Sequence, residues 1–272
     1  MRAKIVMRWA FGLPLLLAAS ACSSTPEPEA AALRREEVTA LRTEAPIAID
    51  GKLDEPAWRD APAYALLHYR NGFNGETPDV QEFFRNGVVE AGTIRLLWDD
   101  TNLYIGFELT DRDVVAEGDA DQELHYRKGD TAEIFLKPAE RSWYWELYVT
   151  PRGKTSSFFI PGCGLRDLPS TVTATPALKG FRAAASYDGT LNDSRDTDRK
   201  WCAEAAIPRA ELAAAGEKLA PEVPWLIFFG RYNYGRHLAV RENTAFPLLQ
   251  KGGFHSQFNY GSLRLRSAPK QP

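Results

Sequence analysis

Alternation of apolar and polar residues is the clearest signal in this chain, and it predicts β-strands. In the stretch 93–99 every second residue is apolar, and the stretch 103–110 repeats the pattern. The four residues 99–102 between them, Asp-Asp-Thr-Asn, have the composition of a turn. The two stretches are therefore expected to form a hairpin.

The same pattern recurs along the chain, while helical signals are few. Strands are also predicted at 131–137, 144–150, 155–159, 182–187, 201–207, 225–232 and 261–265. Asp54 is expected to cap one short helix that contains Pro56 and Trp58, and residues 208–215 form a second helical stretch. Many short strands with so few helices predict an all-β fold, an antiparallel β-sandwich with one or two short peripheral helices.

The strand faces that turn away from this core carry an unusual mixture of carboxylates and aromatic rings. In the second predicted hairpin these residues are Glu133, Phe135, Tyr144, Glu146 and Tyr148. Such mixtures recognise sugars, because rings stack on the apolar face of a pyranose and carboxylates accept hydrogen bonds from hydroxyls. The alternative is that further structure packs over the rings and that the glutamates pair with basic residues.

The first residues have the features of an export signal. Residues 1–21 combine a basic start with an apolar run at 9–19, which is too short to span a bilayer. The run ends in Ala-Ser-Ala before Cys22, which resembles a bacterial lipobox, although Ala19 stands where Leu is usual. This predicts a lipid on Cys22 and a bilayer as partner; an ordinary cleaved signal is the alternative.

The rest of the chain is divided by composition. Residues 22–44 are expected to form a tether rich in Ala, Pro and Glu, followed by the domain at 45–267 and a tail at 268–272. By resemblance to Gram-negative lipoproteins, the absence of Asp after Cys22 implies the outer membrane. The predicted location is thus the bacterial envelope.

Charge excludes nucleic acid as an expected partner. The chain has 33 basic and 36 acidic residues, and the signal contains three of the basic ones, so 30 and 36 remain and the net charge becomes −6. No basic stripe is present. Besides Cys22 the cysteines are Cys163 and Cys202, which form either a disulfide or two partly buried thiols.

Five motifs, in order, resemble the family 9 carbohydrate-binding modules and their DOMON-like relatives, over Ile47 to Leu265. They are Ile49-Asp50-Gly51-Lys52-Leu53-Asp54-Glu55-Pro56-Ala57-Trp58, Ile94-Arg95-Leu96-Leu97-Trp98-Asp99-Asp100 with Leu103-Tyr104-Ile105, Gly129-Asp130-Thr131-Ala132-Glu133-Ile134-Phe135-Leu136, Trp201-Cys202-Ala203-Glu204-Ala205-Ala206-Ile207-Pro208, and Phe254-His255 with Tyr260-Gly261-Ser262-Leu263. The resemblance implies a β-sandwich that binds a sugar between two aromatic rings.

The sugar-binding positions of that family carry over only in part. Its two tryptophans fall at Tyr126 and Phe254, and its glutamate falls at Glu133. Glu146 stands where a binding arginine can occur, so the charge there is reversed.

Three further residues complete the expected binding set. Arg231 and His255 are expected to hydrogen-bond the sugar hydroxyls, and Trp143 is a further candidate ring. The resulting hypothesis is a non-catalytic carbohydrate-binding lipoprotein that supports glycan capture or carbohydrate catabolism. Because both tryptophans are replaced, an envelope structural or interaction protein that has lost the sugar site is the alternative.

Calcium is the predicted metal and haem is not expected. Asp111 and Asp113 offer hard oxygen ligands, and related modules bind calcium; solvated turn residues are the alternative. The methionines are Met1 and Met7, both within the signal, so the predicted domain has no methionine ligand for haem.

Enzymatic motifs are absent from the sequence. There is no G-x-S-x-G, H-E-x-x-H or glycine-rich phosphate loop. Catalysis is conceivable only through paired carboxylates, if Glu133, Glu146 and Glu204 approach one another across adjacent strands as the acid and base of a glycosidase.

Overall fold

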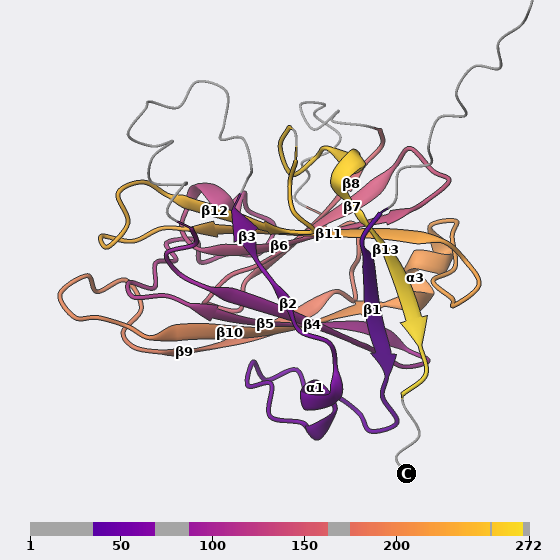
Figure 1. Cartoon of the computed structure of the whole chain (residues 1–272), viewed down its shortest axis with the longest axis horizontal. Coiled ribbons are helices and arrows are strands. Elements are labelled where there is room, and N and C mark those ends of the chain that lie inside the picture. The colour runs from indigo at the N-terminus through magenta and orange to yellow at the C-terminus, as the bar shows by residue number, and fades with distance from the viewer. Residues whose placement is uncertain (1–34, 69–86, 163–174, 251, 269–272) are drawn as a thin grey trace, which may run out of the picture. The chain divides into compact units, whose positions relative to one another are not determined.

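The computed structural model describes residues 35–68, 87–162, 175–250 and 252–268, which form a β-sandwich with two layers (Figure 1). One layer pairs its strands in the order β8-β7-β6-β11, with β12 beside β11, and the other in the order β4-β5-β10-β9. The strands of the first layer are β6 (Thr131–Pro138), β7 (Tyr144–Val149), β8 (Thr155–Ile160), β11 (Trp225–Asn233) and β12 (Glu242–Phe246). Those of the second are β4 (Gly92–Trp98), β5 (Asn102–Thr110), β9 (Arg182–Asp188) and β10 (Lys200–Pro208).

Two further strands, β1 (Glu37–Arg42) and β13 (Gly261–Arg266), connect the layers. The hydrogen-bonded order β11-β13-β1-β4 carries the pairing from one layer into the other. β1 pairs in parallel with both β13 and β4, whereas the remaining strand pairs among the described residues are antiparallel. The short strands β2 (Tyr64–Ala65) and β3 (Leu67–His68) pair with β4 and β12.

The expected domain boundary is corrected by β1. This strand lies within residues 22–44, which were expected to be tether, and it is an integral part of the sheet. Val38 and Ala40 are completely buried in the main core. The short apolar pattern of β1 forms a strand because β13 and β4, which come from distant parts of the chain, supply the partners for its backbone hydrogen bonds.

The core lies between the two layers and confirms the alternation read from the sequence. Ile94, Ile105 and Phe107 from one layer face Ile134 and Phe229 from the other, all with no exposed surface. The rings of Phe107 and Phe229 meet across the layers at 6.0 Å, edge to face. Burying each such side chain contributes roughly 1.5–3 kcal/mol to folding, so these inward faces hold the sandwich together.

Helices are short and peripheral, as predicted. They are α1 (Pro56–Asp60), α3 (Arg209–Ala214) and the 3-10 turns η1 (His125–Arg127) and η2 (Gln257–Asn259). The N-cap of α1 is Glu55, without a side-chain cap bond, so the prediction of Asp54 as cap is wrong. The fold class is confirmed. Within the described part of the chain, no helix is both long and apolar enough to span a membrane.

The outer face of β10 is closed by the segment that begins the predicted domain. Glu204 Oε2 accepts hydrogen bonds from the backbone N–H groups of Asp50 (3.0 Å) and Gly51 (2.9 Å), and its Oε1 accepts one from Trp58 Nε1 (2.9 Å). Gly51 has φ +82°, and a Cβ there would lie 2.6 Å from a backbone atom of Ala185. Glycine is therefore required where this segment crosses the sheet.

Candidate functional site

The outer face of β6, β7 and β11 carries the residues that the sequence pattern singled out. The register places Glu133 opposite Tyr148 of β7 on one side and Gly230 of β11 on the other. Phe135, the next residue on this face, lies opposite Glu146. Because alternate residues of a strand share a face, these side chains form one surface, which we call the outer face of the first layer.

Tyr126 reaches this face from η1. Its ring centroid lies 6.1 Å from that of Tyr148 and 5.2 Å from that of Tyr232 on β11. Tyr234 Oη donates a hydrogen bond to the backbone carbonyl of Tyr126 (2.5 Å). The rings of Tyr126 and Tyr232 are both partly exposed, so they offer aromatic surface to a ligand.

Phe254 reaches the same face from the opposite side but is almost completely covered. Its side chain is 4% exposed, and its ring packs on Gly230, where an added Cβ would lie 2.5 Å from a ring carbon. It also contacts Phe228 at 5.6 Å and Tyr232 at 5.3 Å. The second expected stacking ring is thus part of the apolar cluster, and Tyr232 presents the exposed ring beside it.

Glu146 and Tyr148 form the polar floor of the face together with Glu133. Tyr148 Oη donates to Glu146 Oε1 at 2.7 Å. Burial raises the pKa of Tyr148 well above its ordinary value, and the charges of Glu146 and Glu133 raise it further. Tyr148 therefore stays protonated and fixes one oxygen of Glu146. Glu133 is 1% exposed, which leaves it little contact with solvent.

His255 borders the floor. Its Nε2 lies 3.6 Å from Glu146 Oε1, and its Nδ1 shares a 2.6 Å hydrogen bond with Tyr144 Oη. The imidazole side chain is 15% exposed. The structure therefore brings together Tyr126, Glu133, Glu146, Phe254 and His255, whose positions in the sequence span more than half of the domain.

Two arginines lie over the tyrosine rings at the edge of the face. The Arg241 guanidinium is 4.6 Å from the ring centroid of Tyr232 and 5.5 Å from that of Tyr234. The Arg127 guanidinium is 5.4 Å from the ring centroid of Tyr126. Both arginine residues are exposed; a movement of Arg241 away from its rings would break its hydrogen bonds to Asn243 Oδ1 (3.0 Å) and Tyr234 Oη (3.1 Å).

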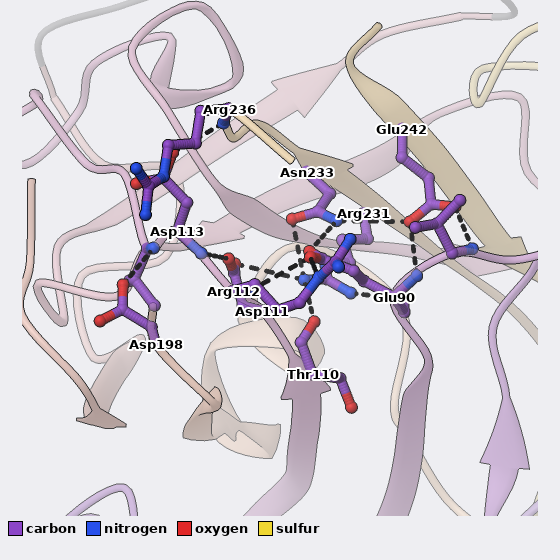
Figure 2. Close-up of polar contacts among 12 residues, drawn as sticks. Glu90, Thr110, Asp111, Arg112, Asp113, Asp198, Arg231, Asn233, Arg236 and Glu242 are labelled. Carbon is purple, nitrogen blue, oxygen red and sulfur yellow. Dashed lines mark hydrogen bonds and ion pairs between the residues drawn. The ribbon is translucent and has the colours of Figure 1, made fainter. Parts of the chain in front are cut away.

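Arg231 is not part of this surface, which corrects its expected role as a sugar ligand. Its side chain points to the inner side of β11, between the layers, and has no exposed surface (Figure 2). It donates hydrogen bonds to the carbonyls of Glu90 (2.9 Å) and Thr110 (2.7 Å) and to Asn233 Oδ1 (2.9 Å). The alternation of 225–232 already assigns Arg231 to the same face as Ile227 and Phe229, which is the inner face of the strand.

Around Arg231 lies a buried network of polar groups. Asn233 Nδ2 donates to Glu90 Oε2 (2.8 Å), and Glu242 accepts from the backbone N–H groups of Val89 (2.7 Å) and Glu90 (3.1 Å). This network joins β11 and β12 to the segment before β4 (Figure 2). Buried charges require such partners, and the hydrogen bonds between these segments restrict the arrangement of the chain.

Asp111, one of the two predicted calcium ligands, belongs to this network. Its Oδ2 lies 3.3 Å from Arg231 Nη2, and its Oδ1 accepts the N–H of Asp113 (3.0 Å). Burial raises the pKa of Asp111 to about 6 despite the Arg231 charge. Burial and the nearby Asp111 likewise raise the pKa of Asp130, which accepts the N–H groups of Val115 and Tyr234 at 2.7 Å each.

Asp113, the other predicted ligand, is 3% exposed and accepts the N–H of Arg236 (2.7 Å). Among the described residues, no three or more His, Cys, Asp or Glu side chains are grouped so that they could hold a metal. The two aspartates have clear protein partners, and calcium binding by them stays a prediction.

Only two of the three glutamates considered for a glycosidase, Glu133 and Glu146, lie on one face. Glu204 lies in the other layer, on β10, with both oxygens engaged by the segment around Gly51 and Trp58. It is therefore separated by the core from Glu133 and Glu146, and the expectation that all three approach one another is corrected.

The remaining predicted residues lie elsewhere or outside the described residues. Trp143 is partly exposed and its ring packs on Trp145 (5.1 Å) and Phe159 (5.7 Å), next to the interlayer core. Cys202 is a buried free thiol, whereas Cys163, the signal at 1–21 and Cys22 lie outside the described residues.

Tyr232, Tyr234 and Arg241 lie at this site but are not among the residues that the sequence predicts there. Tyr232 is in a predicted strand, and its alternation with Ile227 and Phe229 places it on the outer face. Arg241 precedes β12, whose residues Glu242, Asn243 and Thr244 are polar, so the strand shows no apolar alternation although all three residues are buried.

Comparison with known proteins agrees with this architecture. Residues 49–144 match the family model described as carbohydrate family 9 binding domain-like. No curated protein matches the chain. A putative carbohydrate-binding protein from Bacteroides uniformis has a similar structure, with a TM-score of 0.64 at 13% identity over 85% of this chain and 99% of that chain.

Two structures of a family 9 carbohydrate-binding module from Caldicellulosiruptor kristjanssonii are also similar. The complex with cellotriose has a TM-score of 0.54 at 16% identity and covers 86% of this chain and 96% of that chain. The complex with glucose has a TM-score of 0.52 at 15% identity and covers 87% and 99%. At these identities the likeness establishes the fold, which is that of a carbohydrate-binding module of this type.

Proposed function

We propose that this protein is a non-catalytic carbohydrate-binding protein whose site is the outer face of the first layer. One observation carries the proposal: Tyr126, Glu133, Glu146 and His255 converge on one face, with the partly exposed ring of Tyr232 among them. The relatives described as carbohydrate-binding, and the module bound to cellotriose or glucose, support a sugar as the ligand class.

Each group has a part in binding. The rings of Tyr126 and Tyr232 stack on the apolar face of a pyranose, with Arg127 and Arg241 displaced from them. Glu146, oriented by Tyr148, accepts hydrogen bonds from sugar hydroxyls, as does Glu133 where the sugar reaches it. Two carboxylates on the floor repel an anionic sugar, so neutral glycans are expected to bind more tightly than uronates.

The proposal extends to the placement of the protein. The signal at 1–21 and the lipobox-like sequence before Cys22 support a lipid-anchored protein of the bacterial envelope, at the outer membrane, that captures glycans for carbohydrate catabolism. Asp111 and Asp113 are proposed to respond to calcium, on the grounds of the resemblance alone.

A glycan-array screen of the full chain in detergent, with and without calcium, tests this function. We expect binding to neutral oligosaccharides that Tyr126→Ala and Glu146→Gln each weaken by roughly tenfold or more, because the first removes a stacking ring and the second a hydrogen bond to a charged group. Tyr187→Ala is the matched control, because Tyr187 is 44% exposed on β9 in the other layer. Equal affinity of all variants would exclude this face.

The burial of Phe254 favours a second candidate, an envelope interaction protein that keeps the fold without a sugar site. In that case the ring of Phe254 serves only the apolar cluster with Phe228 and Tyr232. Absence of binding to plant, algal, bacterial and host glycans in the same screen would support this candidate.

A further inference from the structure

The loop 252–260 brings Phe254 and His255 to the proposed site, and it contains little regular secondary structure of its own. It connects to β13 through η2 and contains Gly252 and Gly253. Its internal backbone hydrogen bonds run from the N–H of Ser256 to Gly253 O (2.8 Å), from the N–H of Asn259 to Ser256 O (3.0 Å) and from the N–H of Tyr260 to Gln257 O (3.3 Å). So few local bonds hold a loop in place only with help from elsewhere.

Tyr260 attaches one end of this loop to the first layer. Its ring stacks on Phe228 at 5.2 Å with an interplanar angle of 15°. Its Oη donates to the carbonyl of Phe254 (3.0 Å). The position of Tyr260 therefore determines where Phe254 and the adjacent His255 lie against Glu146.

Arg35 holds η2 from the N-terminal side of the domain. Its Nη1 lies at hydrogen-bond distance from three backbone carbonyls, those of Gln257 (3.0 Å), Phe258 (3.1 Å) and Tyr260 (2.8 Å). The next residue, Glu36, accepts the N–H of Ser262 through its carbonyl (2.8 Å), and the parallel pairing of β1 with β13 follows. Arg35 thus extends the β1–β13 contact to the loop.

We propose that Arg35 is a positioning residue for ligand binding, which holds the loop 252–260 so that Phe254 and His255 face the outer surface. This inference rests on the proposed function for its effect on affinity. That Arg35 fixes the position of the loop follows from its contacts with the three carbonyls.

The test compares Arg35→Gln and Arg35→Lys with wild type in the full chain. Amide hydrogen exchange at Ser256, Asn259 and Tyr260 reports the loop, and the affinity for the best sugar of the array reports the site. We expect Arg35→Gln to speed this exchange and to weaken sugar binding roughly tenfold, the equivalent of about one net hydrogen bond to a charged group. A lysine ammonium can contact the same carbonyls, so Arg35→Lys is expected to retain most of the slow amide exchange and most of the sugar affinity of the wild type.

Arg264→Gln is the matched control, because Arg264 also links β13 to β1, through Glu37 at 3.5 Å. Unchanged exchange in Arg35→Gln would overturn the inference, as would faster exchange with unchanged sugar affinity. If wild type binds no sugar, the proposed function fails, and exchange alone then decides whether Arg35 positions the loop.

Discussion

At the scale of single residues, burial decides the role of each charged side chain. Glu146 and Arg231 are polar residues on neighbouring parts of one layer, yet Glu146 keeps some contact with solvent and Arg231 has none. Arg231 therefore needs the partners shown in Figure 2, among them Asp111. A buried guanidinium with a carboxylate partner is a structural element rather than a ligand-binding group.

The raised pKa of Asp111 predicts that stability depends on pH. Its value of about 6 in the folded protein exceeds the ordinary value of about 4 that it has in the unfolded chain. The folded state thus holds this proton more tightly, and the stabilisation is present below about pH 4 and is lost as the pH rises through about 6.

Asp111→Asn is expected to reduce this pH-dependent component, because it removes the titration of Asp111 and the charge that raises the pKa of Asp130; burial still raises the pKa of Asp130 in the variant. The variant is less stable overall because Arg231 loses a charged partner. The free energy of unfolding in urea, measured at pH 4.5 and at pH 7.5, reports this pH-dependent component. Asp60→Asn, at an exposed position, serves as the control and should keep the wild-type difference between the two pH values. The same difference in Asp111→Asn would contradict the interpretation.

At the scale of elements, the sandwich depends on side chains that bind segments across its outer faces. Glu204 of β10 is such a group, because it accepts three hydrogen bonds from the segment that leads into α1. The motif residues Asp50, Gly51 and Trp58 are therefore joined to the "W-x-x-E" strand by one carboxylate. Two motifs 150 residues apart in the sequence form one structural unit.

Glu204→Gln is expected to lower the free energy of unfolding by roughly 2–3 kcal/mol, because an amide NH₂ then faces backbone or indole donors. Chemical denaturation measures the loss. Glu108→Gln is the control on the adjacent strand, where the carboxylate is exposed and 3.3 Å from Lys200; we expect a change within about 0.5 kcal/mol. Similar stability of the two variants would show that Glu204 is not needed to hold the segment.

At the scale of the whole molecule, the proposed function combines a sugar-binding domain with a lipid anchor. The domain begins with Arg35 and β1, which leaves a short segment between Cys22 and the first described residues. A diacylated cysteine anchors a protein stably because two or more acyl chains enter the bilayer. The proposed site on the outer face of the first layer would then act close to the membrane.

Membrane attachment is tested by labelled palmitate in a Gram-negative host. We expect the wild-type chain to incorporate the label and to sediment with membranes, and Cys22→Ser to do neither. Cys202→Ser is the control, because Cys202 is a buried free thiol whose burial raises its pKa to about 11, and this variant should keep the label. Unlabelled wild-type protein in the soluble periplasmic fraction would instead indicate an ordinary cleaved signal.

Alternation by itself determined the nine predicted strands, because a period of two residues is imposed locally by strand geometry. It also identified Glu133, Glu146 and Tyr148 as outer-face residues. The tertiary structure alone decided which outer faces are covered. The segment around Gly51 closes the face of Glu204, and the loop 252–260 brings Phe254 onto Gly230.

The parallel placement of β1 between β13 and β4 was likewise decided only in three dimensions. Its apolar residues Val38, Ala40 and Leu41 form a pattern too short to identify its partners, and its hydrogen-bond partners lie as far away as residues 262–266. Contacts between distant segments depend on the whole packed arrangement, which no local pattern contains.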